Sequence, residues 1–350
     1  MQLVEQFRAQ AQACTNLGSP MYAALLRRLA DDLEGDRRAA TTLRSVLAGH
    51  EDDPGPSALA LRLLGSVHRL VLAGRAPQLA TYYPTVGGRW ELDAGHAAFL
   101  RLLDDDPDAV REWLDRPPQT NEVGRAAALM GGLLLAEPSL RKPVRLFEIG
   151  ASGGLNLLAE RFCYRDGQEV HGDPDSPVRL EDPWRGHRPP PWPDLRVVER
   201  VGGDVAPVDV GTAQGRLTLT AYVWPDQTHR HERMRGAFEL ADREPVAVRR
   251  QGAVDFVEAL ELQAGALTVL WHSVMWQYLS RADQDAVATR IQQLGARAST
   301  EAPFAHLFLE PTRRTQDAEH EFLVVLTTWP GGRRRVLGTS VGHGVPTTWE

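Results

Sequence analysis

Lysine, cysteine and long apolar runs are scarce in this sequence. Lys142 is the only lysine, so 38 of the 39 basic residues are arginines, a bias that a GC-rich genome would produce. Cys14 and Cys163 lie far apart and form neither a zinc motif nor a disulfide framework, which favours a reducing cytoplasm. No segment approaches about 18 consecutive apolar residues, and the amino-terminal residues lack an apolar signal core. We therefore expect a cytoplasmic protein without a membrane span.

The overall composition is that of a globular protein. Of the 350 residues, 43% are hydrophobic and 24% are charged, and a chain of this length can form two domains. The net charge of −7 argues against nucleic acid as the main partner, because nucleic-acid-binding domains usually carry a basic surface.

The pattern of apolar residues changes near residue 140. Residues 1–140 contain mainly segments of helical periodicity, whereas strands alternate with helices in 141–350, which predicts a mostly parallel sheet. We therefore expect an all-helical amino-terminal cap domain followed by a Rossmann-like α/β domain of the methyltransferase type. The expected strands are 144–149, 195–201, 216–224, 266–274 and 304–310, followed by a hairpin of 321–329 and 333–341.

The most informative motif is the glycine-rich segment after the first expected strand. An acidic residue, Glu148, is followed by Gly150 and Gly154 in the pattern E-x-G-x-x-x-G. The glycines let the backbone turn sharply and approach a ligand, and the next helix begins with free N–H groups. This pattern is typical of methyltransferases, so we expect these three residues, with Ser152 and Asn156, to bind S-adenosylmethionine.

Other interpretations of this loop remain open. The segment also fits G-x-S-x-G, which would make Ser152 the nucleophile of a hydrolase, with Asp226 and either His272 or His306 as partners. That fold normally has several strands before the nucleophile, and here only helices precede it. The spacing does not match the dinucleotide motif G-x-G-x-x-G. A glycine turn without a ligand is the simplest alternative.

Acidic residues beyond the loop are candidates for binding the rest of a nucleotide. Asp204 follows strand 195–201, where an Asp after the third strand of such a sheet can accept a hydrogen bond from an adenine amino group. An Asx turn is equally consistent with it. The acid expected after the second strand, for the ribose hydroxyls, has only Glu181 and Asp182 as candidates.

The segment Tyr-Val-Trp-Pro-Asp-Gln ends the expected strand 216–224. Trp224 can hold a methylsulfonium group by cation–π attraction, and Asp226 or Gln227 can bind a substrate amine or act as a base. The alternative is a core tryptophan followed by a helix-capping aspartate.

Strand 266–274 ends in a second polar and aromatic cluster. His272 can act as a general base near neutral pH, although a lone histidine on a strand is often a core residue with satisfied hydrogen bonds. Trp276 follows it, and Glu310 ends the next strand at the same edge of the sheet. We expect Trp276 and Glu310 to contact the substrate.

The helical half contributes candidate residues of its own. Tyr82, Glu122 and Arg125 can complete the substrate site, with Arg125 binding a carboxylate, although each can also be a capping or surface residue. His229 and His231 lack a third ligand at fixed spacing, so we expect no metal.

The chain resembles the domain-of-unknown-function 2332 family. The resemblance rests on FRAQAQACTNLGSPMYAALLRRLADDL, EIGASGGLNLL, YVWPDQ and WHSVMWQYL, and it covers nearly the whole chain. It implies a methyltransferase-like sheet with a helical amino-terminal region.

The leading hypothesis is transfer of a methyl group from S-adenosylmethionine to a small molecule. Three alternatives are kept: another substitution on the same fold, such as an intramolecular cyclisation; a hydrolase acting through Ser152; and a non-catalytic binding subunit with a partner protein. The sequence does not identify the substrate.

Overall fold

The computed structural model describes residues 2–35, 38–53, 58–135, 142–189 and 195–350. Its internal contacts divide the chain into two units. The helical unit consists of residues 1–120 and 212–231, and the sheet unit of residues 121–211 and 232–350. The expected boundary at 140/141 lies outside the described residues. The internal contacts place residues up to 120 in the helical unit and residues 121–211 in the sheet unit.

Short helices packed around an apolar core form the helical unit. In α2, Pro20 occupies the first turn, and Ser19 caps the helix by accepting a hydrogen bond from Tyr22 N at 3.4 Å. The elements are α1 (Gln2–Asn16), α2 (Pro20–Glu34), α3 (Arg38–Leu47), α4 (Leu59–Leu72), α5 (Pro77–Ala80), η2 (Pro84–Val86), α6 (Leu92–Asp105), α7 (Pro107–Arg111) and α9 (Ala213–Ala221). The boundary at 231/232 falls within α10 (Thr228–Arg243).

The strand expected at 216–224 is wrong, because these residues form most of helix α9 and its carboxyl-terminal turn. Thr212 caps the helix by accepting from Gly215 N at 3.0 Å. The hydroxyls of Thr218 and Thr220 donate to carbonyls four residues earlier, so the threonines that suggested a strand are satisfied within the helix. The motif after this helix therefore belongs to the helical unit.

The sheet unit is built on a nine-stranded sheet of described residues, in the order β5-β12-β11-β10-β9-β8-β1-β6-β7. Its strands are β1 (Val144–Ile149), β5 (Trp184–Gly186), β6 (Val197–Asp204), β7 (Ala247–Arg250), β8 (Leu267–Ser273), β9 (Phe304–Thr312), β10 (Glu321–Trp329), β11 (Arg333–Ser340) and β12 (Thr347–Trp349). The other strands predicted from the sequence are confirmed within a few residues.

Five neighbouring strands are parallel, and the next three are antiparallel. In spatial order the parallel strands are β7, β6, β1, β8 and β9, which corresponds to 3-2-1-4-5 in chain order. Strands β10 and β11 form the expected antiparallel hairpin. The fold is therefore α/β, with a large and mostly parallel sheet and an amino-terminal helical region.

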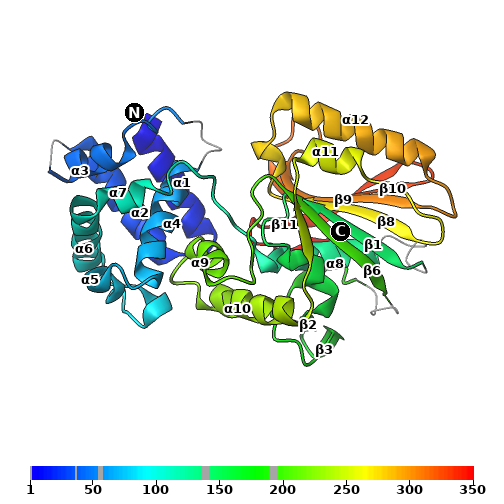
Figure 1. Cartoon of the computed structure of the whole chain (residues 1–350), viewed down its shortest axis with the longest axis horizontal. Helices are drawn as coiled ribbons and strands as arrows, with labels where there is room; N and C mark the ends of the chain where they lie inside the picture. The colour runs from blue at the N-terminus through cyan, green and yellow to red at the C-terminus, as the bar shows by residue number, and fades with distance from the viewer. Residues whose placement is uncertain (1, 36–37, 54–57, 136–141, 190–194) are drawn as a thin grey trace. The chain divides into compact units, whose positions relative to one another are not determined.

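Helices cover both faces of this sheet. Figure 1 shows α11 (Ala253–Glu258) and α12 (Arg281–Arg297) on one face and α8 (Ala126–Leu134) on the other. The α12 face contains Phe147, Leu270 and Phe304 in one apolar cluster. Because side chains alternate along a strand, Glu148 and Trp271, which are paired in register, lie on the α8 face.

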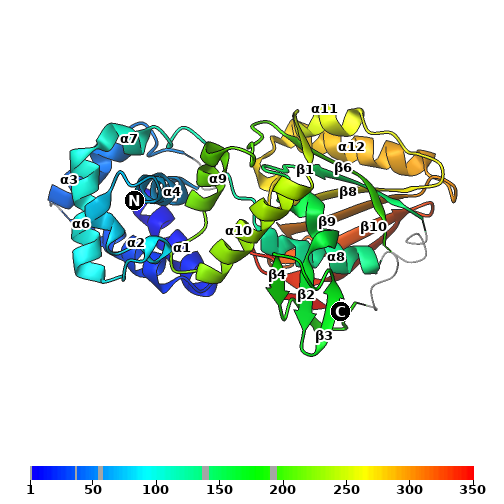
Figure 2. The same cartoon turned by 60° about the horizontal axis from the view of Figure 1, so that its bottom comes forward.

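The long segment between β1 and β6 contains further structure. It begins with η5 (Leu155–Arg161) and continues into a three-stranded sheet of β2 (Cys163–Asp166), β3 (Glu169–Gly172) and β4 (Arg179–Glu181), shown in Figure 2. Two shorter elements are η3 (Val123–Arg125) and η6 (Trp276–Tyr278). Among the described residues, no helix is long and apolar enough to cross a membrane.

Candidate functional site

The strand order places the candidate site at the carboxyl ends of β1 and β8. From β1 the parallel order extends through β6 and β7 on one side and through β8 and β9 on the other. Open α/β sheets bind ligands in the crevice where the order reverses in this way. The two loops at this position are 150–154, after β1, and 274–278, after β8.

The loop after β1 is held in a constrained conformation. Gly150 and Gly154 have φ values of +68° and +74°, and Ser152, although not a glycine, has a φ of +53°. Gly150 N donates to Gly203 O at 2.9 Å, and Ser152 N donates to Asp204 Oδ2 at 2.8 Å. A left-handed serine is uncommon and requires support from its surroundings, which the end of β6 provides.

Asp204 is adjacent to this loop, but at a different position from the one expected. Strand β6 is the second parallel strand in chain order, not the third, so Asp204 occupies the position expected for a ribose-binding acid. Its other oxygen, Oδ1, accepts from Ala206 N at 2.8 Å. Glu181 ends β4 of the small sheet and Asp182 follows it, so neither ends a strand of the main sheet.

Glu148 is a buried acid on the central strand, only 2% exposed. Its Oε2 has no hydrogen-bond partner among the described residues. Burial raises the pKa of Glu148 to about 8. The indole N–H of Trp271, its neighbour on β8, and the positive charge of Arg125 lower this pKa, while the negative charge of Asp204 raises it. A carboxyl group in this position can bind a polar group of a ligand held at this edge of the sheet.

Residues 121–125 belong to the sheet unit and support the glycine loop. Asn121 Oδ1 accepts from Leu155 N at 2.9 Å, and Asn156 Nδ2 donates to Glu122 O at 3.2 Å. The Glu122 side chain accepts from Gly124 N at 3.0 Å. These contacts place the predicted residues Glu122 and Asn156 together beside the start of η5.

Arg125 lies near the end of β8 and is only 8% exposed. Its Nε donates to Gly342 O at 3.0 Å, and one terminal nitrogen donates to Ser273 O at 3.3 Å. The guanidinium thus joins β8 to the loop that precedes β12.

Asn156 Oδ1 is buried and has no hydrogen-bond partner among the described residues, as is also true of Glu148 Oε2.

The loop after β8 contains a second strained residue. Val274 has a φ of +51°, an outlier for a β-branched side chain, and its N donates to Leu309 O at 3.0 Å. Met275 contacts the glycine loop, because a Cβ added to Gly150 would lie 2.8 Å from Met275 Cβ. The two loops are therefore in direct contact.

His272 lies on the face of the sheet opposite Glu148, because it follows Trp271 on β8. Its Nδ1 is 2.8 Å from Glu310 Oε1, and its Nε2 is 3.0 Å from His306 Nε2. Its ring stacks on Trp276, with centroids 5.2 Å apart. The structure thus brings His272, Trp276 and Glu310 together, but on the other side of the sheet from the glycine loop's acid.

The remaining predicted residues belong to the helical unit. Asp226 accepts from Ser19 Oγ at 2.7 Å and from Met21 N at 2.9 Å, so it helps to cap α2. Gln227 Nε2 donates to Leu17 O at 2.6 Å. Trp224 is part of the buried core, and Tyr82 packs against that core.

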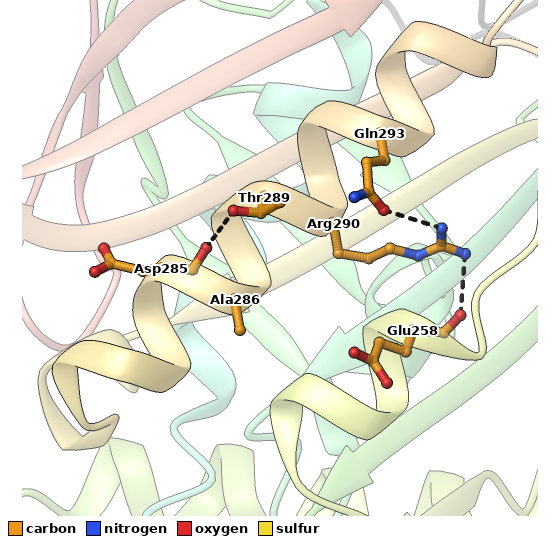
Figure 3. Close-up of a pocket in the computed structure, with 6 residues that line it drawn as sticks. All are labelled: Glu258, Asp285, Ala286, Thr289, Arg290 and Gln293. Atoms are coloured by element: carbon orange, nitrogen blue, oxygen red, sulfur yellow. Dashed lines mark hydrogen bonds between the residues drawn. The ribbon is translucent and has the colours of Figure 1, made fainter.

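A separate groove of about 570 Å³ lies between α11 and α12. Figure 3 shows Arg290 reaching from α12 to the carbonyl oxygen of Glu258, at 3.0 Å. The other residues that line the groove are Asp285, Ala286, Thr289 and Gln293. The groove includes none of the predicted site residues. In the described part of the chain, no three His, Cys, Asp or Glu side chains are grouped as metal ligands.

Sequence reasoning missed Val274, since a β-branched residue gives no signal for a left-handed backbone. His306 was expected only as a possible partner of Ser152, whereas in the structure it pairs with His272. The pairing of His272 with His306 depends on the register of β8 against β9, and a local sequence motif does not encode this register.

The fold is α/β, and the two loops form a candidate site at the carboxyl edge of its parallel strands. Residues 4–349 match the family described as "Uncharacterized protein conserved in bacteria (DUF2332)", and the chain belongs to that family. No curated protein and no solved structure matches the chain.

Proposed function

We propose that this protein is a methyltransferase-like enzyme that binds S-adenosylmethionine and transfers its methyl group to a small molecule. The observation that carries the proposal is Glu148, a buried carboxyl group with an unpartnered oxygen on the central strand, directly before the glycine loop. A buried polar atom without a partner is costly, so a ligand group that supplies the missing hydrogen bond would be bound well.

The strand order supports a nucleotide-like ligand. The order 3-2-1-4-5 of the parallel strands is that of dinucleotide-binding sheets, whose ligand lies over the loop after the first strand. Here that loop is 150–154. Asp204, at the end of the second parallel strand, is suitably located to accept hydrogen bonds from ribose hydroxyls, because a carboxylate can accept about four.

In this proposal the protein acts mainly by positioning. Gly150 and Gly154 give the loop its left-handed turns and its close packing against Met275 and Val248. Glu148 and Asn156 offer their free oxygens to the polar groups of the cofactor. Methyl transfer is an in-line displacement, which gains most from holding the two reactants aligned and free of water. Bound S-adenosylmethionine would supply the methyl group and the sulfonium leaving group.

Calorimetric binding of S-adenosylmethionine tests the proposal. We expect Glu148→Gln to weaken binding by about tenfold, the equivalent of one charged hydrogen bond. Glu199→Gln, which removes a carboxylate from β6 that pairs with Arg145 instead, is the matched control and should bind normally. No binding to the unaltered protein at millimolar ligand would contradict the proposal.

A second readout comes from proton release. A cationic group of the ligand beside Glu148 favours the ionised carboxylate, so binding below pH 8 should expel a proton. Calorimetry in two buffers of different ionisation enthalpy measures this proton. It should be absent from Glu148→Gln.

A hydrolase is a second candidate, favoured by one observation. Ser152 has a φ of +53° in a G-x-S-x-G turn between a strand and a helix, as the nucleophile elbow requires. Against it, His272 pairs with Glu310 and His306. Labelling by a fluorophosphonate that is lost in Ser152→Ala would select the hydrolase.

A further inference from the structure

The two oxygens of Glu310, at the end of β9, have different surroundings. Oε1 is the acceptor for His272 Nδ1 at 2.8 Å, for Met275 N at 3.0 Å and for Trp276 N at 3.3 Å. Oε2 is buried and has no hydrogen-bond partner in the described part of the chain. The local donors therefore converge on one oxygen and leave the other available.

The free acceptor in this cluster is Glu310 and not His272. Both ring nitrogens of His272 are engaged, one by Glu310 and the other by His306 at 3.0 Å. Phe308 and Trp276 also stack on its ring, with centroids 5.2 Å away in each case. The imidazole is thus fixed in place, and it fixes the orientation of the carboxylate.

The cluster adjoins the candidate cofactor loop. Met275, which donates to Glu310, is the residue that contacts Gly150. Val274, immediately before it, is strained at a φ of +51°, and strain of this kind is common at ligand sites. Tyr278, at the end of the same turn, is 48% exposed, so the turn reaches the surface.

We propose that Glu310 Oε2 binds the amino group of a small-molecule substrate. A carboxylate oxygen with a vacant position is best satisfied by an N–H donor, and a protonated amine adds a charge-assisted hydrogen bond. Trp276, whose N donates to Glu310 and whose ring stacks on His272, adds an aromatic group of the kind that attracts cations. This inference rests on the proposed function for the location of the cofactor, and it adds the chemical class of the substrate.

Benzylamine and its neutral analogue benzyl alcohol are suitable probes, followed by NMR of the protein labelled with ¹⁵N at histidine. We expect the amine to bind at least about tenfold more tightly than the alcohol. Only the amine should shift the ring-nitrogen signals of His272, which are assigned with a His272→Gln variant. The His272 signals respond to the carboxylate because Nδ1 is hydrogen-bonded to Glu310. If Glu310 had only a structural role, adding the amine would not shift these signals.

Glu310→Gln is the decisive variant, because glutamine keeps the oxygen that accepts from His272 and replaces Oε2 with an NH₂ group. It should bind benzylamine no better than benzyl alcohol. The matched control, Glu258→Gln, removes an exposed carboxylate from α11 and should retain the preference for the amine. Equal binding of benzylamine to the unaltered protein and Glu310→Gln, or no binding to either, would overturn the proposal.

The same proteins separate this inference from the proposed function. Glu148→Gln should weaken S-adenosylmethionine and leave benzylamine binding intact, whereas Glu310→Gln should do the reverse. If the amine preference depends on Glu310 but S-adenosylmethionine does not bind, the amine site stands and the cofactor assignment fails. If the cofactor binds and the amine preference is absent, the amine site fails alone.

Discussion

Glu148 combines an ionisable group with a location that excludes water. It is 2% exposed, and burial raises its pKa to about 8 from an ordinary value of 4.5. Near neutral pH the carboxyl group is therefore largely protonated in the folded protein without a ligand. Burial disfavours the charged form of Glu148 in the folded protein. Because the carboxyl group can ionise freely in the unfolded chain, its ionisation favours unfolding.

The stability of the protein should consequently depend on pH through Glu148. Between pH 4.5 and about 8, the folded protein retains a proton that the unfolded chain has lost, so rising pH lowers the free energy of unfolding. The slope from this group is up to about 1.4 kcal/mol per pH unit. Urea unfolding of the unaltered protein and Glu148→Gln at several pH values measures it.

The informative quantity is the difference between these two proteins. Glutamine does not titrate, so the unfolding free energy of the unaltered protein minus that of Glu148→Gln should fall as the pH rises through this window. A difference that stays constant with pH would mean that Glu148 is already ionised in the folded protein.

At the scale of elements, the glycine loop depends on close packing against the segment before and within β7. Gly154 has a φ of +74°, and a Cβ added there would lie 2.7 Å from Val248 Cγ2. Gly167, in the turn between β2 and β3, has a similar φ of +63° but no atom within 4 Å of such a Cβ. Alanine at either position would strain the backbone, but only at Gly154 would it also clash with a neighbouring side chain.

We expect Gly167→Ala to cost about 1 kcal/mol of stability, because alanine is disfavoured in the left-handed conformation. Gly154→Ala should cost about 1–3 kcal/mol more, since the added methyl group overpacks the contact with Val248. Thermal or urea unfolding of both variants gives the comparison. Equal losses would show that the loop can move away from β7 without penalty.

Strands with continuous apolar runs were the elements that the sequence predicted well. β1, β8 and β9 are apolar runs in a parallel sheet, which is buried on both faces. The segment 216–224 was misassigned because its alternating Leu and Thr mimic a strand, while its actual helical signal was the capping residue Thr212. Local pattern could not reveal that this helix packs with residues from the first part of the chain.

Several candidate residues named from the sequence lie together in the structure, but their arrangement could not be predicted. Glu148, Ser152 and Asp204 were expected at one strand edge, and the register of β1 and β6 does bring them together. That His272 lies on the opposite face from Glu148 follows only from the pairing of β1 with β8. Register is fixed by contacts between distant segments, so a single motif does not encode it.

At the scale of the whole molecule, the helical unit is discontinuous in sequence. Residues 212–231 return to it after the chain has begun the sheet unit. The Tyr222 ring lies so close to Gly65 that a Cβ there would be 2.5 Å from it, and it stacks on Trp113 with centroids 5.8 Å apart. His68 Nδ1 is 3.0 Å from Ala221 O. This segment therefore completes the core of the helical unit.

A fragment of residues 1–140, the domain expected from the sequence, should consequently fail to fold cooperatively. Without 212–231, the buried His68 loses its partner at Ala221, and Gly65 and Trp113 lose the ring that packs on them. We expect such a fragment to keep helical circular dichroism, to lose near-ultraviolet signal and to bind a hydrophobic dye. Joining 212–231 to residue 120 through a flexible linker should restore cooperative unfolding.

The same fusion carrying Tyr222→Ala is the control, because it keeps the chain length and removes the ring that fills the space over Gly65. It should unfold with a lower midpoint than the fusion, since truncating a large aromatic side chain in a core costs about 3–5 kcal/mol. If the fragment 1–140 alone unfolds as cooperatively as the fusion, the returning segment is dispensable. The helical region would then be an independent domain, as its position in the sequence first suggested.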